Sequence, residues 1–231
     1  MGSTLVDAFS LLGTLDSRLL GIVGLSLRVS LAAVLFGTLL GLPLGAWIAV
    51  SRFPGRGAVI VAINALMGLP SVVVGVIVYL LLSRSGPFGS LGLLFSPPAM
   101  IVAQALLVTP LVAAVSRQIV EDAWREYAPE MRLIGLSRWA SARLLLLDCR
   151  FSLLVATLAG VGRAMSEVGA VMIVGGNIDG FTRVMTTAIA LETSKGDLAL
   201  SIALGIVLMG LILALNATAH VLRSWAARRY G

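Results

Sequence analysis

Residues 119–150, IVEDAWREYAPEMRLIGLSRWASARLLLLDCR, are the longest charged stretch of the chain and lie between two long apolar runs. We call them the elbow segment. Acidic and basic residues are balanced along it, whereas binding to an anionic membrane surface favours an uninterrupted basic face. The segment is also too long for a simple connector between two helices. An amphipathic segment resting on lipid headgroups is one interpretation, and a docking surface for another protein is the better one.

The apolar runs around the elbow segment predict an integral membrane protein. Of the 231 residues, 58% are hydrophobic and 12% are charged, and the mean hydropathy is +1.02. A helix needs roughly 20 residues to cross a hydrocarbon core of about 30 Å. We therefore expect an all-α polytopic fold whose main domain, 20–222, contains five transmembrane helices: 20–50, 58–82, 95–118, 151–174 and 198–222.

The two ends of the chain complete this domain organisation. Leu5, Phe9, Leu12, Leu15 and Leu19 recur at helical spacing, which predicts an amphipathic helix on the membrane surface within 1–19. Residues 223–231 form a basic tail. If the N-terminus is outside and the C-terminus is cytoplasmic, most of the 17 Lys and Arg residues fall on the inner side of the cell membrane. The net charge of +6 then reflects topology, and no nucleic-acid partner is expected.

The elbow segment itself predicts a helix–turn–helix on the inner face. The first helix would run from about Glu121 to Ile134, with Pro129 breaking or bending it. Gly135 suits the left-handed position that ends a helix, and Ser137 can cap the next one.

Small residues and prolines predict close packing and kinks within the spans. Gly37, Gly41 and Gly45 recur every four residues, a spacing that brings helix backbones together. Helix kinks are expected at Gly68, Pro70, Gly75 and Pro110.

Catalytic chemistry finds little support in the sequence. Cys149 is the one cysteine and His220 the one histidine, too few for a zinc or thiol site. No phosphate-binding loop occurs, so the chain cannot hold ATP by itself. We expect no cofactor, no metal and no enzymatic activity in this chain.

Two charges interrupt the fourth span, in GRAMSEVGAVMIVGGNI at 162–178. Arg163 and Glu167 stand four residues apart, so they share a helix face and can pair. Either they form an internal ion pair that braces the bundle, or they line a translocation path for an anion. Arg28 in the first span is expected to lie near a helix end, where its side chain can reach the interface.

Several of these stretches resemble a known family. Aligned on Gly135, the elbow segment resembles the cytoplasmic coupling motif of type I ABC importer permeases. The glycine, the aliphatic Leu145 and Leu147, and the GLSRW run fit that motif, whereas Pro129, Glu130 and Met131 stand where it has E-A-A, and Asp148 stands where it has proline. LMGLPSVVVGVIVYLLLSRSGPFG, GRAMSEVGAVMIVGGNI and TRVMTTAIALETSKGD are similar to tungstate-type permeases, which are relatives of the molybdate and sulfate permeases.

The resemblance implies a translocation subunit with partners. Two copies would form the pore, and an extracytoplasmic binding protein would deliver the oxyanion. Two ABC ATPase subunits carrying ATP and Mg²⁺ would dock on the elbow segment, at Glu130, Met131, Gly135, Ser137 and Arg138. Arg163 and Glu167 would lie on the pathway or gate. In the polar outer segment 175–197, expected to contain a short interfacial helix, the binding protein would contact Asn177, Arg183 and Thr186, unless the segment is only a connector.

Other functions stay open at this point. Tungstate and molybdate are tetrahedral dianions of nearly equal size, so sequence reasoning does not separate a tungstate permease from a molybdate or sulfate permease. A stand-alone secondary transporter or channel would not need the charged elbow segment. A membrane scaffold for a soluble partner would not need Arg163 and Glu167.

Overall fold

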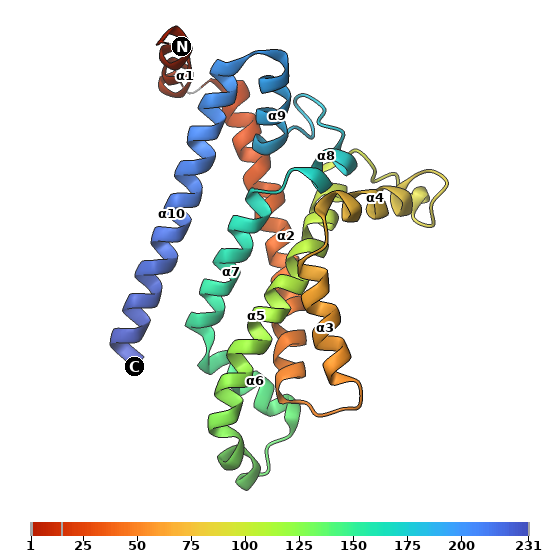
Figure 1. Cartoon of the computed structure of the whole chain (residues 1–231), viewed down its shortest axis with the longest axis vertical. Coiled ribbons are helices and arrows are strands. Elements are labelled where there is room, and N and C mark those ends of the chain that lie inside the picture. Colours follow the sequence, from red (N-terminus) through yellow and green to blue (C-terminus); the bar gives the residue numbers. More distant parts are fainter. Residues whose placement is uncertain (1, 15, 231) are drawn as a thin grey trace. The chain divides into compact units, whose positions relative to one another are not determined.

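The computed structural model describes residues 2–14 and 16–230, except for the side chains of 2, 3, 226, 227, 229 and 230. Within these residues all regular structure is helical (Figure 1). The helices are α1 Gly2–Gly13, α2 Ser17–Val50, α3 Arg56–Met67, α4 Ser71–Leu82, η1 Gly89–Leu91, α5 Pro97–Leu133, α6 Arg138–Asp148, α7 Arg150–Met165, α8 Gly169–Gly175, α9 Met185–Lys195 and α10 Leu198–Tyr230.

The chain divides into two compact units. Unit 1 comprises Met1–Ala33, Pro70–Gln104 and Gly162–Leu215, and unit 2 comprises Val34–Leu69, Ala105–Val161 and Asn216–Gly231. Because α2, α5, α7 and α10 each continue from one unit into the other, each unit contains helix segments that are distant in sequence.

Three helices are long and apolar enough to cross a membrane, namely α2, α5 and α10, the last over Leu198–Trp225. Two broken helix pairs, α3 with α4 and α6 with α7, raise this number to five if each pair counts as one span. The protein is therefore all-helical with three to five spans. The expected span 58–82 is broken at 68–70, where a kink is predicted around Gly68 and Pro70, and the expected span 151–174 is broken at 166–168, where none is predicted. The break at 68–70 includes Pro70, as expected of a helix breaker.

The glycine repeat of α2 packs directly on α5 within unit 2. A Cβ atom built on Gly45 would lie 2.4 Å from the carbonyl oxygen of Ala113 and 2.8 Å from the amide nitrogen of Arg117. Gly41 faces Thr109 in the same way, at 2.9 Å from its carbonyl oxygen. Nearby, the Ser116 hydroxyl donates a 3.1 Å hydrogen bond to the Leu42 carbonyl. The close approach predicted from the glycine spacing is confirmed.

Helix α5 does not stop at the start of the elbow segment but continues to Leu133, so the expected separate helix at 121–134 is wrong. Pro129 lies inside α5 and does not break it. Packing supplies the reason: on the face opposite this exposed proline, Val120 and Met131 are buried against Ala142 and Leu145 of α6. This core holds the last turns of α5 helical despite the lost backbone hydrogen bond.

The turn after α5 has the predicted geometry. Gly135 has φ +70°, its amide donates to the Arg132 carbonyl at 3.1 Å, and the Leu136 amide donates to the Met131 carbonyl at 3.0 Å. This is a Schellman motif, in which a left-handed residue ends the helix. The Ser137 side chain then caps α6 by accepting from the Ala140 amide at 3.2 Å.

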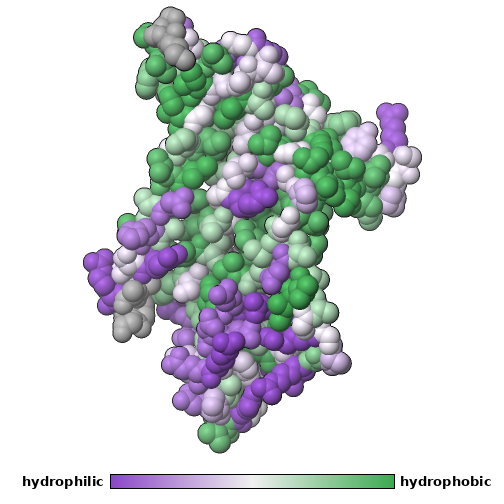
Figure 2. All heavy atoms as spheres, in the orientation of Figure 1, coloured by the Kyte–Doolittle hydropathy of each residue, from purple (hydrophilic) through white to green (hydrophobic). Residues whose placement is uncertain are grey.

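Charged side chains surround this end of unit 2, where Figure 2 shows hydrophilic residues gathered around α6 and the end of α5. Glu121 is their centre. It pairs with Arg56 of α3 at 3.3 Å, with Arg117, and with Arg125 at 3.5 Å. These pairs tie the start of α3 to α5.

At the N-terminal end a helix forms within 1–19 as predicted, but α1 stops at Gly13 and Leu19 belongs to α2, so the apolar stripe from Leu5 to Leu19 does not lie on one helix. Asp16 caps the start of α2, because its carboxylate accepts hydrogen bonds from the Arg18 amide at 2.9 Å and the Leu19 amide at 3.1 Å. Leu15 lies outside the described residues. At the other end, the basic tail continues α10 as far as Tyr230.

The α2–α5 contact gives a stability prediction. Gly45→Ala should lower the thermal unfolding midpoint of the purified protein in detergent, because overpacking against backbone atoms costs roughly 1–3 kcal/mol. Gly205→Ala in α10 is the matched control, since nothing lies within 4 Å of a Cβ atom there. Equal midpoints for the two variants would contradict the packing described here.

Candidate functional site

Arg163 and Glu167 lie at the break between α7 and α8 in unit 1. Helix α7 ends at Met165, and α8 begins at Gly169. The Glu167 amide turns back to the Ala164 carbonyl at 3.2 Å. The predicted pairing is confirmed, although the two residues do not share one continuous helix as expected.

The pair is asymmetric in its burial. An Arg163 Nη1 atom donates to Glu167 Oε2 at 2.9 Å, and the side chains are 40% and 3% exposed, respectively. The second carboxylate oxygen of Glu167 accepts from the Ala170 amide in the first turn of α8 at 3.2 Å. The buried carboxylate therefore has partners for both oxygens, while the guanidinium keeps part of its surface free.

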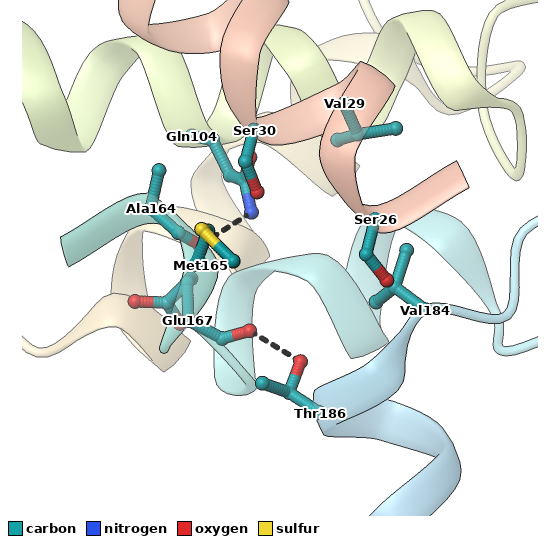
Figure 3. Close-up of a pocket in the computed structure, with 9 residues that line it drawn as sticks. All are labelled: Ser26, Val29, Ser30, Gln104, Ala164, Met165, Glu167, Val184 and Thr186. Carbon is teal, nitrogen blue, oxygen red and sulfur yellow. Dashed lines mark hydrogen bonds between the residues drawn. The ribbon is translucent and has the colours of Figure 1, made fainter. Parts of the chain in front are cut away.

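Two other side chains satisfy the backbone at the break (Figure 3). Gln104 of α5 donates through Nε2 to the Ala164 carbonyl at 3.0 Å. Thr186 of α9 donates through its hydroxyl to the Glu167 carbonyl at 2.7 Å. Irregular backbone among apolar helices persists only where protein or water satisfies its polar groups. Sequence reasoning missed the role of Gln104, whose one signal was a polar amide in an otherwise apolar run.

A small pocket lies beside the break (Figure 3). It is lined by Ser26, Val29, Ser30, Gln104, Ala164, Met165, Glu167, Val184 and Thr186, and its free volume of about 10 Å³ is room for one water molecule. The buried Gln104 Oε1 atom has no hydrogen-bond partner in the part of the chain that the structure describes. A water there would satisfy it. The only charged group in the lining is the Glu167 carboxylate, so the pocket in this conformation does not suit an anion.

Helix α8 is held by close packing on α4, beside which it lies in unit 1 (Figure 1). A Cβ atom on Gly75 of α4 would lie 2.8 Å from Ala170 Cα. The start of α8 therefore has little freedom to move away from α4, which fixes the position of the Ala170 amide that donates to Glu167.

The outer segment contains α9, which matches the short helix expected there. Arg183 is 8% exposed and pairs with Asp179 at 2.9 Å and Glu192 at 3.5 Å. Asn177, with φ +52°, donates to the Thr187 carbonyl at 3.3 Å. The side chains of Arg183 and Thr186 are thus buried in internal contacts. Their expected contact with a binding protein stays a prediction, and the exposed residues around them are Ile178, Asp179 and Phe181.

The structure brings the elbow residues together around one turn. Met131 is buried in the α5–α6 core, and Glu130 is exposed. Gly135 and Ser137 form the turn and the cap, and Arg138 Nη1 donates to the Arg52 carbonyl at 3.1 Å. The tip carries exposed apolar side chains, namely Leu133, Ile134, Leu136 and Trp139.

Metal binding finds no support among the described residues, since no three His, Cys, Asp or Glu side chains lie close enough together there to share an ion. Unit 1 thus contains a break between two helices with a pocket for one water molecule beside it. Unit 2 contains a turn between α5 and α6 that exposes apolar side chains.

Known proteins resemble the chain along nearly its whole length. No protein-family model matches it. A probable anion ABC transporter permease protein of Haloferax volcanii is 41% identical over 226 residues, which are 95% of this chain and 97% of that protein. The tungstate uptake system permease protein TupB of Peptoclostridium acidaminophilum is 38% identical over 216 residues, 94% of this chain and 95% of that protein.

A more distant relative is the sulfate transport system permease protein CysW of Synechocystis, 31% identical over 166 residues, which are 68% of this chain and 60% of that protein. The relatives at 41% and 38% identity match the chain almost from end to end, so the likeness covers both units and the elbow segment. On this ground, the chain is a multi-pass membrane protein that belongs to the permease subunits of ABC transporters.

Proposed function

We propose that this chain is the permease subunit of an ATP-driven importer of tungstate or a similar oxyanion. The observation that carries the proposal is the end-to-end likeness to a permease named for tungstate uptake and to one named for an anion. A molybdate or sulfate importer is the alternative within the class, supported by relatives with those names at 27% and 31% identity. The lower identity over a smaller share of the chain favours tungstate.

The proposed assembly contains two copies of this chain, two ABC ATPase subunits that bind ATP and Mg²⁺, and an extracytoplasmic oxyanion-binding protein. The elbow segment lies on the cytoplasmic side in this proposal, and the outer segment around Asn177, Arg183 and Thr186 faces the binding protein. Because Arg183 and Thr186 are buried, that contact is made through their exposed neighbours.

The elbow segment is proposed to dock on the ATPase. Exposed apolar side chains next to charged ones at its tip suit a protein groove better than water, because exposed apolar clusters commonly mark interaction sites. The Schellman motif fixes the angle between α5 and α6, so a push on the tip moves both helices. Helix α5 also carries Gln104, whose side chain donates to the Ala164 carbonyl at the α7–α8 break.

Arg163 and Glu167 are proposed to act at the gate. The partly exposed guanidinium supplies positive potential to a passing dianion, and Glu167 neutralises it when no substrate is present. The competing explanation is an ion pair that only stabilises the packing of the helices, and a double substitution distinguishes the two roles.

Uptake itself is the first test. Proteoliposomes that contain this chain, its ATPase and its binding protein should accumulate tungstate only when ATP is present. Vesicles with this chain alone are the control. Uptake by the chain alone without ATP would favour a stand-alone transporter and contradict the proposal.

The turn at Gly135 provides a test of docking. Gly135→Val should reduce both the recovery of the ATPase with the permease and ATP-dependent uptake, because a β-branched residue at φ +70° costs roughly 1–2 kcal/mol or more. Gly135→Asn is the matched control, since Asn tolerates this conformation and nothing within 4 Å meets its Cβ atom. Full ATPase recovery and uptake with Gly135→Val would count against the elbow as the docking site.

A double substitution separates the gate from the brace. Arg163→Met leaves a buried carboxylate without its cation and should destabilise the protein by roughly 3–5 kcal/mol. Adding Glu167→Gln removes that charge and keeps an oxygen for the Ala170 amide, so stability should return. We expect uptake by the double variant to stay at least about tenfold below wild type. Recovery of uptake together with thermal stability would show that the pair is only a brace.

A further inference from the structure

A second and larger cavity of unit 1 lies where the start of α2 faces the turn at 179–183. Its free volume is about 380 Å³. Its charged lining consists of three arginines and one acid, namely Arg18, Arg28, Arg183 and Asp179. We call this cavity the arginine pocket. Neither the α7–α8 break nor the elbow segment contributes to its lining.

The arginine pocket carries more positive than negative charge. Asp179 pairs with Arg183 at 2.9 Å and with Arg18 at 3.5 Å. Glu192 lies behind the lining and is shared by Arg18 at 3.4 Å, Arg183 at 3.5 Å and Lys195 at 3.4 Å. The lining itself therefore holds three arginines against one carboxylate. The ordinary result of such an excess is an attraction for anions.

Arg28 contributes a positive charge to this pocket without an acidic partner among the described residues. It is exposed, it lies eleven residues after the start of α2, and it has no hydrogen bond or ion pair with any residue that the structure describes. A charged side chain within an apolar membrane helix is costly unless it has a partner or reaches water. About 16 Å of α2 precede Arg28, and its expected position near the end of the membrane span stays a prediction. An anionic ligand would supply the missing partner.

Two contacts in the pocket suit reversible binding. The Arg18 pairs, at 3.4 and 3.5 Å, are long, and Asp179 is 57% exposed. The ion pair between Arg18 and the exposed Asp179 therefore contributes little to stability. An incoming anion can therefore replace the Asp179 carboxylate at Arg18 at low cost, while Arg183 stays anchored by Glu192.

We propose that the arginine pocket binds a tetrahedral oxyanion, held by Arg18, Arg28 and Arg183 in competition with Asp179. The oxyanion is either a free dianion such as tungstate or the phosphate of an anionic lipid, and both offer the same oxygens to guanidinium groups. The choice of tungstate as the free ion rests on the proposed function. The proposal that the pocket binds an oxyanion is independent of that function.

Opposite effects of two substitutions test the pocket. The full-length chain, purified with the subunits that remain bound to it, is placed in phosphatidylcholine nanodiscs and titrated with sodium tungstate and with sodium sulfate by calorimetry. Arg28→Gln should weaken binding roughly fivefold. Asp179→Asn should strengthen it roughly threefold, because the internal competitor loses its charge. Arg84→Gln, which makes the same charge change outside the lining, is the control and should bind like wild type.

A second arm identifies the source of the anion. In nanodiscs that contain phosphatidylglycerol, a lipid ligand would compete with tungstate and would be retained by the wild-type protein, but not by Arg28→Gln, in native mass spectrometry. A free oxyanion would bind equally in both lipids. Either result supports the pocket. Equal affinities for wild type, Arg28→Gln and Asp179→Asn, with no Arg28-dependent lipid, would overturn it.

The outcomes also separate this inference from the proposed function. If vesicles accumulate no tungstate while sulfate binding depends on Arg28, the proposed substrate is wrong and the pocket stands. If vesicles accumulate tungstate while the variants all bind alike, the pocket is wrong and the proposed function stands.

Discussion

A break in a helix among apolar neighbours leaves amide and carbonyl groups that must find partners inside the protein. In this chain the break lies at 166–168, and it is satisfied from two directions. The Glu167 carboxylate accepts from the first turn of α8, while Gln104 and Thr186 donate to carbonyls at the break. The buried carboxylate in turn requires the cation of Arg163. Arg163 and Glu167 are thus explained in part by the need of the backbone at 166–168 for hydrogen-bond partners. The proposed gate uses these same two side chains, which the fold already holds in place.

Helix α5 takes part in both regions. It runs from Pro97 to Leu133, with Gln104 in its first part and the buried Met131 in its last turn. The Schellman motif at Gly135 then makes the elbow a defined joint. In the proposed function, an ATPase docks on this joint and acts on α5 and α6 together.

The sequence predicted what depends on local residues. The Gly135 turn, the Ser137 cap and the Arg163–Glu167 pair follow from short-range geometry, and the structure has them. What failed depends on distant contacts. Pro129 is tolerated because α6 packs on the opposite face of α5. The break at 166–168 contains no proline or glycine, and the side chains that satisfy it come from positions 104 and 186, so no local signal marked it.

The central claim, that internal hydrogen bonds hold the break closed around Glu167, is tested most directly by amide hydrogen exchange. In the wild-type protein the peptide 162–176 should exchange slowly, and in Glu167→Ala it should exchange much faster, while peptides from the elbow segment stay unchanged. Fast exchange of 162–176 in the wild type, or equal exchange in both proteins, would contradict the account.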